Sequence, residues 1–128
     1  MPAFSRFPFL AGGFFALTAV ILGAFGAHAL QDLLAERETT YAWETAVQYQ
    51  MWHALALILV ALLPTENRLS LAMAGCFTLG VVLFSGSLYW LATGGPGWIG
   101  PVTPLGGLSL IVGWVLFLAR GFKPADRS

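Results

Sequence analysis

Charged side chains are scarce in this sequence. Six basic and six acidic residues make up 9% of the 128-residue chain, hydrophobic residues make up 58%, and the mean hydropathy is +0.78. A soluble globular domain is about 25% charged and about 45–50% apolar, so this few charges could not cover a surface that faces water. The composition excludes an ordinary soluble domain and indicates a protein whose main solvent is lipid.

Cysteines, basic clusters and catalytic motifs are also lacking. The single cysteine, Cys76, excludes an internal disulfide framework and a multi-cysteine metal cluster. A net charge of zero removes the attraction that nucleic-acid-binding proteins use, so no nucleic-acid partner is expected. Because there is no nucleophile beside a base, no paired carboxylate motif and no phosphate-binding glycine loop, the sequence predicts a protein that is not an enzyme.

Long runs without Asp, Glu, Lys or Arg are present instead. There are four, at about residues 7–30, 45–63, 69–93 and 102–119. A bilayer core of about 30 Å needs roughly 20 apolar residues of helix, and short connections imply antiparallel neighbours. The sequence predicts a single integral-membrane domain over residues 1–128, an all-α four-helix transmembrane bundle with up-down antiparallel topology.

The basic residues indicate how this bundle is oriented. Five of the six would lie on one side of the membrane, with Arg37 alone on the other: Arg6, Arg68, Arg120, Lys123 and Arg127. Cytoplasmic loops are enriched in Lys and Arg. We therefore expect a multi-pass protein of the inner (plasma) membrane with both termini in the cytoplasm.

The first connection allows two interpretations. Leu30, Leu33 and Leu34 recur at helical spacing opposite Asp32 and Glu36, which suits a short helix lying on the outer membrane surface. An ordinary polar connection explains the same residues equally well.

Polar side chains within the spans gather at one depth, in the outer half. Such groups are expensive to bury in hydrocarbon and are candidates for function. The candidate cluster comprises His28, Gln48, Tyr49, Gln50, His53, Ser85, Ser87, Tyr89 and Thr103. Two interpretations remain open: the groups hydrogen-bond across the bundle and fix helix register, or they form a small polar pocket open to the outside, in which His28 and His53 titrate near neutral pH.

A cofactor is not expected in this cluster. His28 and His53 could ligate a haem only if their nitrogens met at one level, but His53 lies about 12 Å below the start of its span at 1.5 Å per residue, whereas His28 is near the surface. Cys76 lies in the inner half of the bundle, which disfavours a zinc or copper site with either histidine. The sequence predicts no metal and no cofactor.

Small and aromatic residues predict packing and anchoring. A stripe on the first span allows another helix to approach closely, and Gly106 and Gly113 on the fourth span could be its counterpart; the stripe consists of Gly12, Ala16, Ala19, Gly23 and Ala27. Aromatic rings settle at the headgroup level of a bilayer. The expected anchors are Tyr41, Trp43, Tyr89, Trp90 and Trp98.

Four sequence strings, one in each expected span, resemble a known family. The strings are GAFGAHAL at 23–30, TAVQYQMWHALAL at 45–57, FSGSLY at 84–89 and TPLGG at 103–107. Together they resemble the YgdD-like small membrane proteins, known as domain of unknown function 423. The resemblance spans nearly the whole chain and implies a bacterial inner-membrane protein of four helices. It implies no particular substrate.

Two functions of different classes remain as hypotheses. The first is a non-enzymatic lipid-binding, protein-binding or structural membrane component, with membrane lipids, a membrane-protein partner or further copies of the chain as partners. The alternative is a small-molecule or proton-coupled carrier that uses the outer polar cluster. Because four helices are few for a transporter, the carrier would act as a homo-oligomer.

Overall fold

Helices account for all the regular structure in the described part of the chain. The computed structural model describes residues 4–64 and 67–122. In chain order its elements are α1 (Arg6–Ala27), α2 (Gln31–Arg37), α3 (Thr40–Ala61), α4 (Arg68–Ala92), the 3-10 turn η1 (Gly97–Ile99) and α5 (Val102–Phe122). The predicted all-α class is confirmed for these residues. Five α-helices are present rather than four, because residues 31–37 form a helix of their own.

The ends of the helices follow local signals. At the start of α4, the Asn67 side chain accepts a hydrogen bond from the Ser70 backbone N–H at 3.0 Å, and the Ser70 hydroxyl accepts one from the Asn67 N–H at 2.9 Å. This reciprocal capping satisfies two N–H groups that a helix end otherwise leaves free. Helix α3 begins at Thr40, five residues before the expected start of the span, because a carboxylate such as Glu44 is tolerated near a helix N-terminus.

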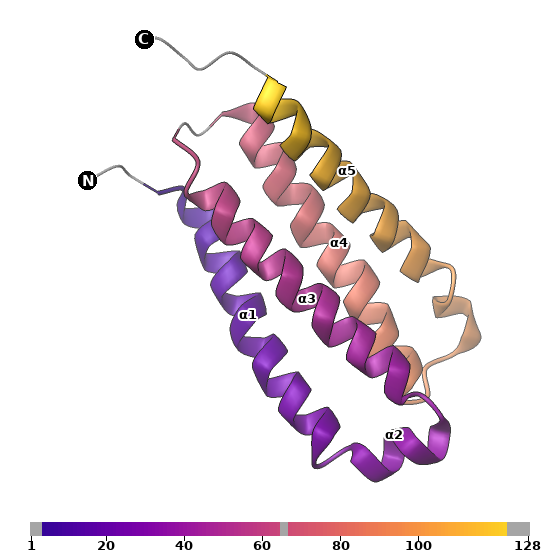
Figure 1. Cartoon of the computed structure of the whole chain (residues 1–128). Coiled ribbons are helices and arrows are strands. Elements are labelled where there is room, and N and C mark those ends of the chain that lie inside the picture. The colour runs from indigo at the N-terminus through magenta and orange to yellow at the C-terminus, as the bar shows by residue number, and fades with distance from the viewer. Residues whose placement is uncertain (1–3, 65–66, 123–128) are drawn as a thin grey trace.

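The long helices lie side by side in a row in the order α1, α3, α4, α5, and neighbours run antiparallel (Figure 1). Extensive contacts join α1 to α3, α3 to α4 and α4 to α5, whereas α1 touches α4 only slightly. No substantial interface joins α1 to α5 within the described residues. The predicted up-down order is present, but the row is open rather than closed into a bundle.

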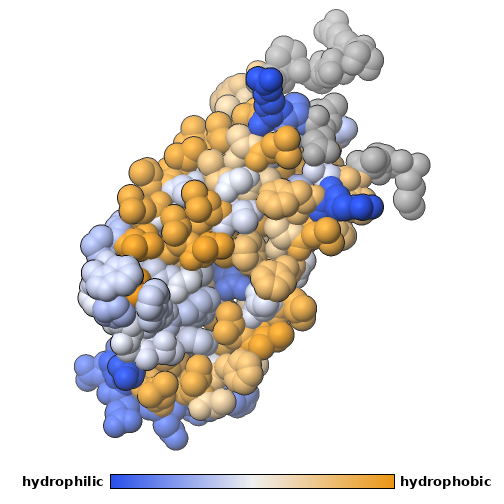
Figure 2. Space-filling model, turned by 180° about the vertical axis from the view of Figure 1, so that it is seen from behind, coloured by the Kyte–Doolittle hydropathy of each residue, from blue (hydrophilic) through white to orange (hydrophobic). Residues whose placement is uncertain are grey.

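Within residues 4–64 and 67–122, three helical segments are long and apolar enough to cross a membrane: α1, α4, and α5 together with η1. Helix α3 has 22 residues, a length of about 33 Å at 1.5 Å per residue, but the polar residues of its first half lower its hydropathy. In Figure 2, the most hydrophilic residues lie mainly at the two ends of the visible face, and hydrophobic residues cover much of the surface between them, interrupted by a region of intermediate hydropathy toward one end. This is the surface of a membrane protein.

Glycines allow the close approach of neighbouring helices. A Cβ atom at Gly12 of α1 would lie 2.7 Å from the Ala54 carbonyl oxygen of α3. A Cβ at Gly106 of α5 would collide with the backbone of Phe84 in α4, and one at Gly113 would lie 2.7 Å from the Phe77 ring. The predicted close approach at these glycines is confirmed, but the expected pairing of the two sets is wrong: the first stripe packs against α3, and Gly106 and Gly113 pack against α4.

Helix α2 closes one end of the row, which we call the α2 end. The Leu34 side chain packs in a small core with Trp43 of α3 and Ala92 of α4, and the Thr39 hydroxyl donates to the Ala92 carbonyl at 2.8 Å. The opposite end, where α1 begins and α5 ends, is the terminal end. The helical interpretation of residues 31–37 is confirmed, and their position on a membrane surface stays a prediction.

Candidate functional site

Gln50 joins three helices through its side-chain amide. Its Nε2 donates to the Phe15 carbonyl at 2.9 Å and to the Thr18 hydroxyl at 2.7 Å, both on α1. Its Oε1 accepts a hydrogen bond from the Tyr89 hydroxyl of α4 at 2.7 Å. Both amide N–H donors and the carbonyl are therefore used, and Gln50 is only 4% exposed.

His53 joins α3 to α5. The Trp114 indole Nε1–H donates to His53 Nε2 at 3.0 Å, and His53 Nδ1 lies 2.7 Å from the Tyr49 carbonyl oxygen. Because an indole nitrogen can only donate, Nε2 must be the acceptor. The proton of the neutral ring is therefore on Nδ1, where it donates to Tyr49. Both ring nitrogens are used by protein groups.

Hydroxyl groups make the remaining connections between helices. Ser85 of α4 donates to the Ala46 carbonyl of α3 at 2.7 Å. Ser87 of α4 and Thr103 of α5 share a hydrogen bond of 2.6 Å. Each bond lies at a different point along the row, so these residues form separate connections rather than the lining of one cavity.

The predicted cluster therefore divides into three groups. Six of its nine members take part in hydrogen bonds to another helix: Gln50, His53, Ser85, Ser87, Tyr89 and Thr103. Tyr49 packs against Phe84 and the His53 ring. His28 and Gln48 lie apart from these connections on the exposed surface. This arrangement is the one that the register-fixing interpretation expects.

His28 lies at the C-terminal end of α1, where it lines a shallow apolar depression with Ile21 and Phe25. A second groove, of about 390 Å³, opens between α3 and α5 beside His53, and its walls are almost entirely apolar. Neither hollow brings together a set of polar groups. Within the described residues, no three His, Cys, Asp or Glu side chains come close enough to hold a metal ion.

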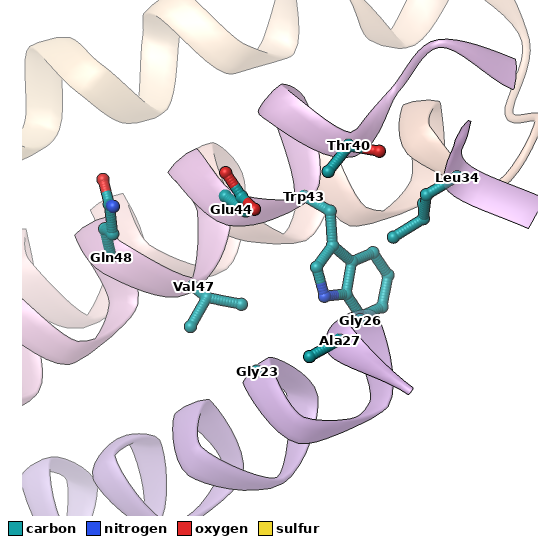
Figure 3. Close-up of a pocket in the computed structure, with 9 residues that line it drawn as sticks. All are labelled: Gly23, Gly26, Ala27, Leu34, Thr40, Trp43, Glu44, Val47 and Gln48. Atoms are coloured by element: carbon teal, nitrogen blue, oxygen red, sulfur yellow. The ribbon is translucent and has the colours of Figure 1, made fainter. Parts of the chain in front are cut away.

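A more polar pocket, of about 210 Å³, lies at the α2 end between α1, α2 and α3 (Figure 3). Small residues of α1 form one side of it, and longer side chains of α2 and α3 form the other. Its lining consists of Gly23, Gly26, Ala27, Leu34, Thr40, Trp43, Glu44, Val47 and Gln48. Of these residues, only Gln48 belongs to the cluster predicted from the sequence.

Trp43 forms the wall between this pocket and the core. Its indole N–H donates to the Leu22 carbonyl of α1 at 2.9 Å, and its ring occupies the space that a side chain at Gly26 would need. The ring is 5% exposed. The expectation that Trp43 anchors the protein at the membrane surface is therefore wrong, because α2 folds over it. Tyr41 and Trp98 are 82% and 67% exposed, as anchors would be.

Thr40, Glu44 and Gln48 form the polar rim of the pocket. They follow one another at four-residue steps and so share one face of α3. In Figure 3, Trp43 and Val47 point across the gap toward α1, whereas Glu44 and Gln48 stand on the rim away from it. None of the three rim side chains has a hydrogen-bond or ion-pair partner among the described residues, and the suggested Glu44–Gln48 pair is not formed.

The rim supplies one carboxylate acceptor, one hydroxyl and one amide, beside an apolar wall. This set can hold a ligand by charge and hydrogen bonding. The polar residues that do have partners are used to join helices, whereas these three are free to contact something else.

The sequence is similar to that of known membrane proteins. The family model described as "Protein of unknown function (DUF423)" matches residues 22–107, a stretch that contains every residue of the pocket. The UPF0382 membrane protein SH2409 of Staphylococcus haemolyticus is 41% identical over 113 residues, covering 88% of this chain and 92% of the relative. No solved structure matches.

Two further relatives come from different bacteria. The UPF0382 membrane protein YwdK of Bacillus subtilis is 42% identical over 115 residues, covering 88% of this chain and 93% of its own. A UPF0382 membrane protein of Haemophilus influenzae is 37% identical over 112 residues, with 87% of each chain covered. The resemblance found in the four sequence strings is thus confirmed, and the chain belongs to the DUF423 family of UPF0382 membrane proteins.

Proposed function

We propose that the protein is a non-enzymatic membrane component that binds a phospholipid in the pocket at the α2 end. The observation that carries this proposal is the change in polarity along the exposed face of α3. Glu44 and Gln48 are followed on that face by Leu55 and Leu59, all within an arc of about 60° at 100° per residue. The two leucines are each 52% exposed.

The polar residues at the α2 end of this face, followed by apolar residues, match the polar headgroup and apolar acyl chains of a phospholipid. A polar headgroup would meet the rim residues, and an acyl chain would follow the leucines toward the terminal end. A soluble metabolite would not contact the apolar half of the face. A membrane-protein helix that covered this face would bury Glu44, and no described basic residue lies there to pair with it.

Four membrane spans, with both termini in the cytoplasm, are part of the proposal. Helix α3 is the least apolar of the long helices, but its buried polar groups are hydrogen-bonded to α1, α4 and α5, which removes most of the cost of placing them in lipid. Arg6, Arg68 and Arg120 lie at the terminal end and Arg37 at the α2 end. The excess of basic residues supports a cytoplasmic terminal end in the inner membrane.

The test fills the pocket and measures the bound lipid. A Cβ at Gly23 would lie at an ordinary distance of 3.4 Å from Val47, so Gly23→Leu should extend its side chain into the pocket without displacing α3. The matched control is Gly13→Leu on the same helix, where nothing lies within 4 Å of the added Cβ. Native mass spectrometry of protein released from nanodiscs of mixed bacterial phospholipids gives the retained lipid directly.

We expect the wild type and Gly13→Leu to retain lipid and Gly23→Leu to lose most of it. Equal retention by all three proteins would contradict a lipid site in this pocket. A retained water-soluble solute in place of lipid would also contradict it, and would favour the carrier hypothesis.

A further inference from the structure

We infer that the pocket selects phospholipids whose headgroup ends in a primary ammonium group, as in phosphatidylethanolamine, with Glu44 as the partner of the ammonium. The inference rests on the proposed lipid-binding function and names the class of lipid. It comes from the charge, the spacing and the size of the pocket.

The charge of the pocket favours a cation. Glu44 is the only ionisable residue in its lining. The same end of the molecule carries Asp32, Glu36 and Glu38 on or beside α2. Arg37, the one arginine or lysine at this end among the described residues, is directed to the loop after α4, since a Cβ at Gly94 would lie 2.8 Å from its Nη atoms. An anionic headgroup would therefore meet repulsion with no described basic partner in the pocket.

The spacing of the rim suits a zwitterion. Thr40 and Gln48 lie one turn to either side of Glu44, about 6 Å away along the axis of α3 at 1.5 Å per residue. A carboxylate only accepts hydrogen bonds, whereas a hydroxyl and an amide nitrogen can donate. The Glu44 carboxylate can thus accept from the ammonium while Thr40 or Gln48 donates to a phosphate oxygen of the same headgroup.

Two other kinds of cation fit less well. A calcium ion takes six to eight oxygen ligands, more than three rim side chains supply, and a cavity of about 210 Å³ far exceeds the size of an ion. A quaternary choline has no N–H to donate to Glu44 and is usually held by several aromatic faces. Only one aromatic ring, that of Trp43, lines the pocket.

The experiment measures lipid preference. The protein is incorporated into nanodiscs with equal amounts of phosphatidylethanolamine, phosphatidylglycerol and phosphatidylcholine, and the retained lipids are counted by native mass spectrometry. The variant Glu44→Gln removes the charge at constant shape. The control, Glu36→Gln, removes an exposed charge of α2 that does not line the pocket. Thermal unfolding of both variants checks that the fold is kept.

We expect the wild type and Glu36→Gln to prefer phosphatidylethanolamine, and Glu44→Gln to lose about fivefold of that preference, as for the loss of one charge-assisted hydrogen bond. Lipid bound without a preference, with a preference for another headgroup, or with one that Glu44→Gln leaves unchanged would overturn the inference and leave the lipid-binding function standing. Failure of the wild type to retain any lipid would overturn both.

Discussion

At the scale of single residues, replacing Gln50 tests how much the hydrogen bonds between helices stabilise the protein. Replacing it with methionine keeps the length of the side chain but removes its hydrogen bonds to Thr18 and Tyr89 and leaves the Tyr89 hydroxyl without its acceptor. We expect Gln50→Met to lower the free energy of unfolding by about 1–3 kcal/mol. Unfolding in mixed micelles followed by circular dichroism measures this loss.

The matched control is Gln48→Met, which makes the same chemical change two residues away on an exposed position without a hydrogen bond among the described residues. It should change stability by no more than about 0.5 kcal/mol. Equal destabilisation by the two variants would mean that the hydrogen bonds of Gln50 contribute nothing specific.

His53 should matter for stability and not for ligand binding. In His53→Leu the Trp114 indole loses its acceptor, and we expect a lower melting temperature in detergent together with unchanged lipid retention, because His53 does not line the pocket. Gly23→Leu should show the reverse pattern. A variant at His53 that keeps its stability but loses a specific bound species would contradict the register-fixing role.

Some of these residue-level connections could be predicted from the sequence, and others could not. The depth of Gln50, His53 and Tyr89 could be counted from the ends of their spans, but their partners depend on which helices are neighbours. The contact between Thr18 and Gln50 is one example. Thr18 meets Gln50 because the two residues lie twelve and eleven positions from the terminal ends of the antiparallel helices α1 and α3.

At the scale of helices, the packing of α4 against α5 depends on one missing side chain. A Cβ at Gly106 would collide with the backbone of Phe84, which cannot rotate away as a side chain can. Gly106→Ala should therefore destabilise the protein by about 1–3 kcal/mol. The adjacent Gly107→Ala is the control, since its Cβ would make an ordinary 3.7 Å contact with the Phe84 ring. Thermal unfolding of the pair separates the backbone collision from a general effect of glycine replacement.

The charge-free runs were sufficient to predict the long helices, and the small-residue stripes predicted where helices approach closely but not which helices are partners. They were not sufficient for the pocket, because it exists only where α2 folds back over Trp43 and Leu34 packs beside it. The seven residues of α2 suited a helix and a polar connection equally well. Packing against α3 and α4 favours the helix over an irregular connection, and the local sequence of residues 31–37 does not predict that packing.

At the scale of the whole molecule, the proposed orientation can be tested with reporters. A reporter that is active only in the periplasm should be silent when it is fused after residue 128 and active when it is inserted after Glu38. If α3 does not cross the membrane, an additional reporter fused after Pro64 would be active, although it should be silent in the four-span topology. The same reporters fused to a cytoplasmic protein provide the background signal.

The order of contacts divides the molecule into two hairpins, α1 with α3 and α4 with α5, joined through the α3–α4 face. Each hairpin is made of consecutive long helices, so each can insert into the membrane as soon as it is synthesised. Side-chain hydrogen bonds cross between them within the described residues: from Tyr89 to Gln50, from Ser85 to the Ala46 carbonyl, from Trp114 to His53, and from Thr39 beside α3 to the Ala92 carbonyl. A gene cut between Pro64 and Asn67 should thus yield two fragments that associate in the membrane and restore the row of four long helices.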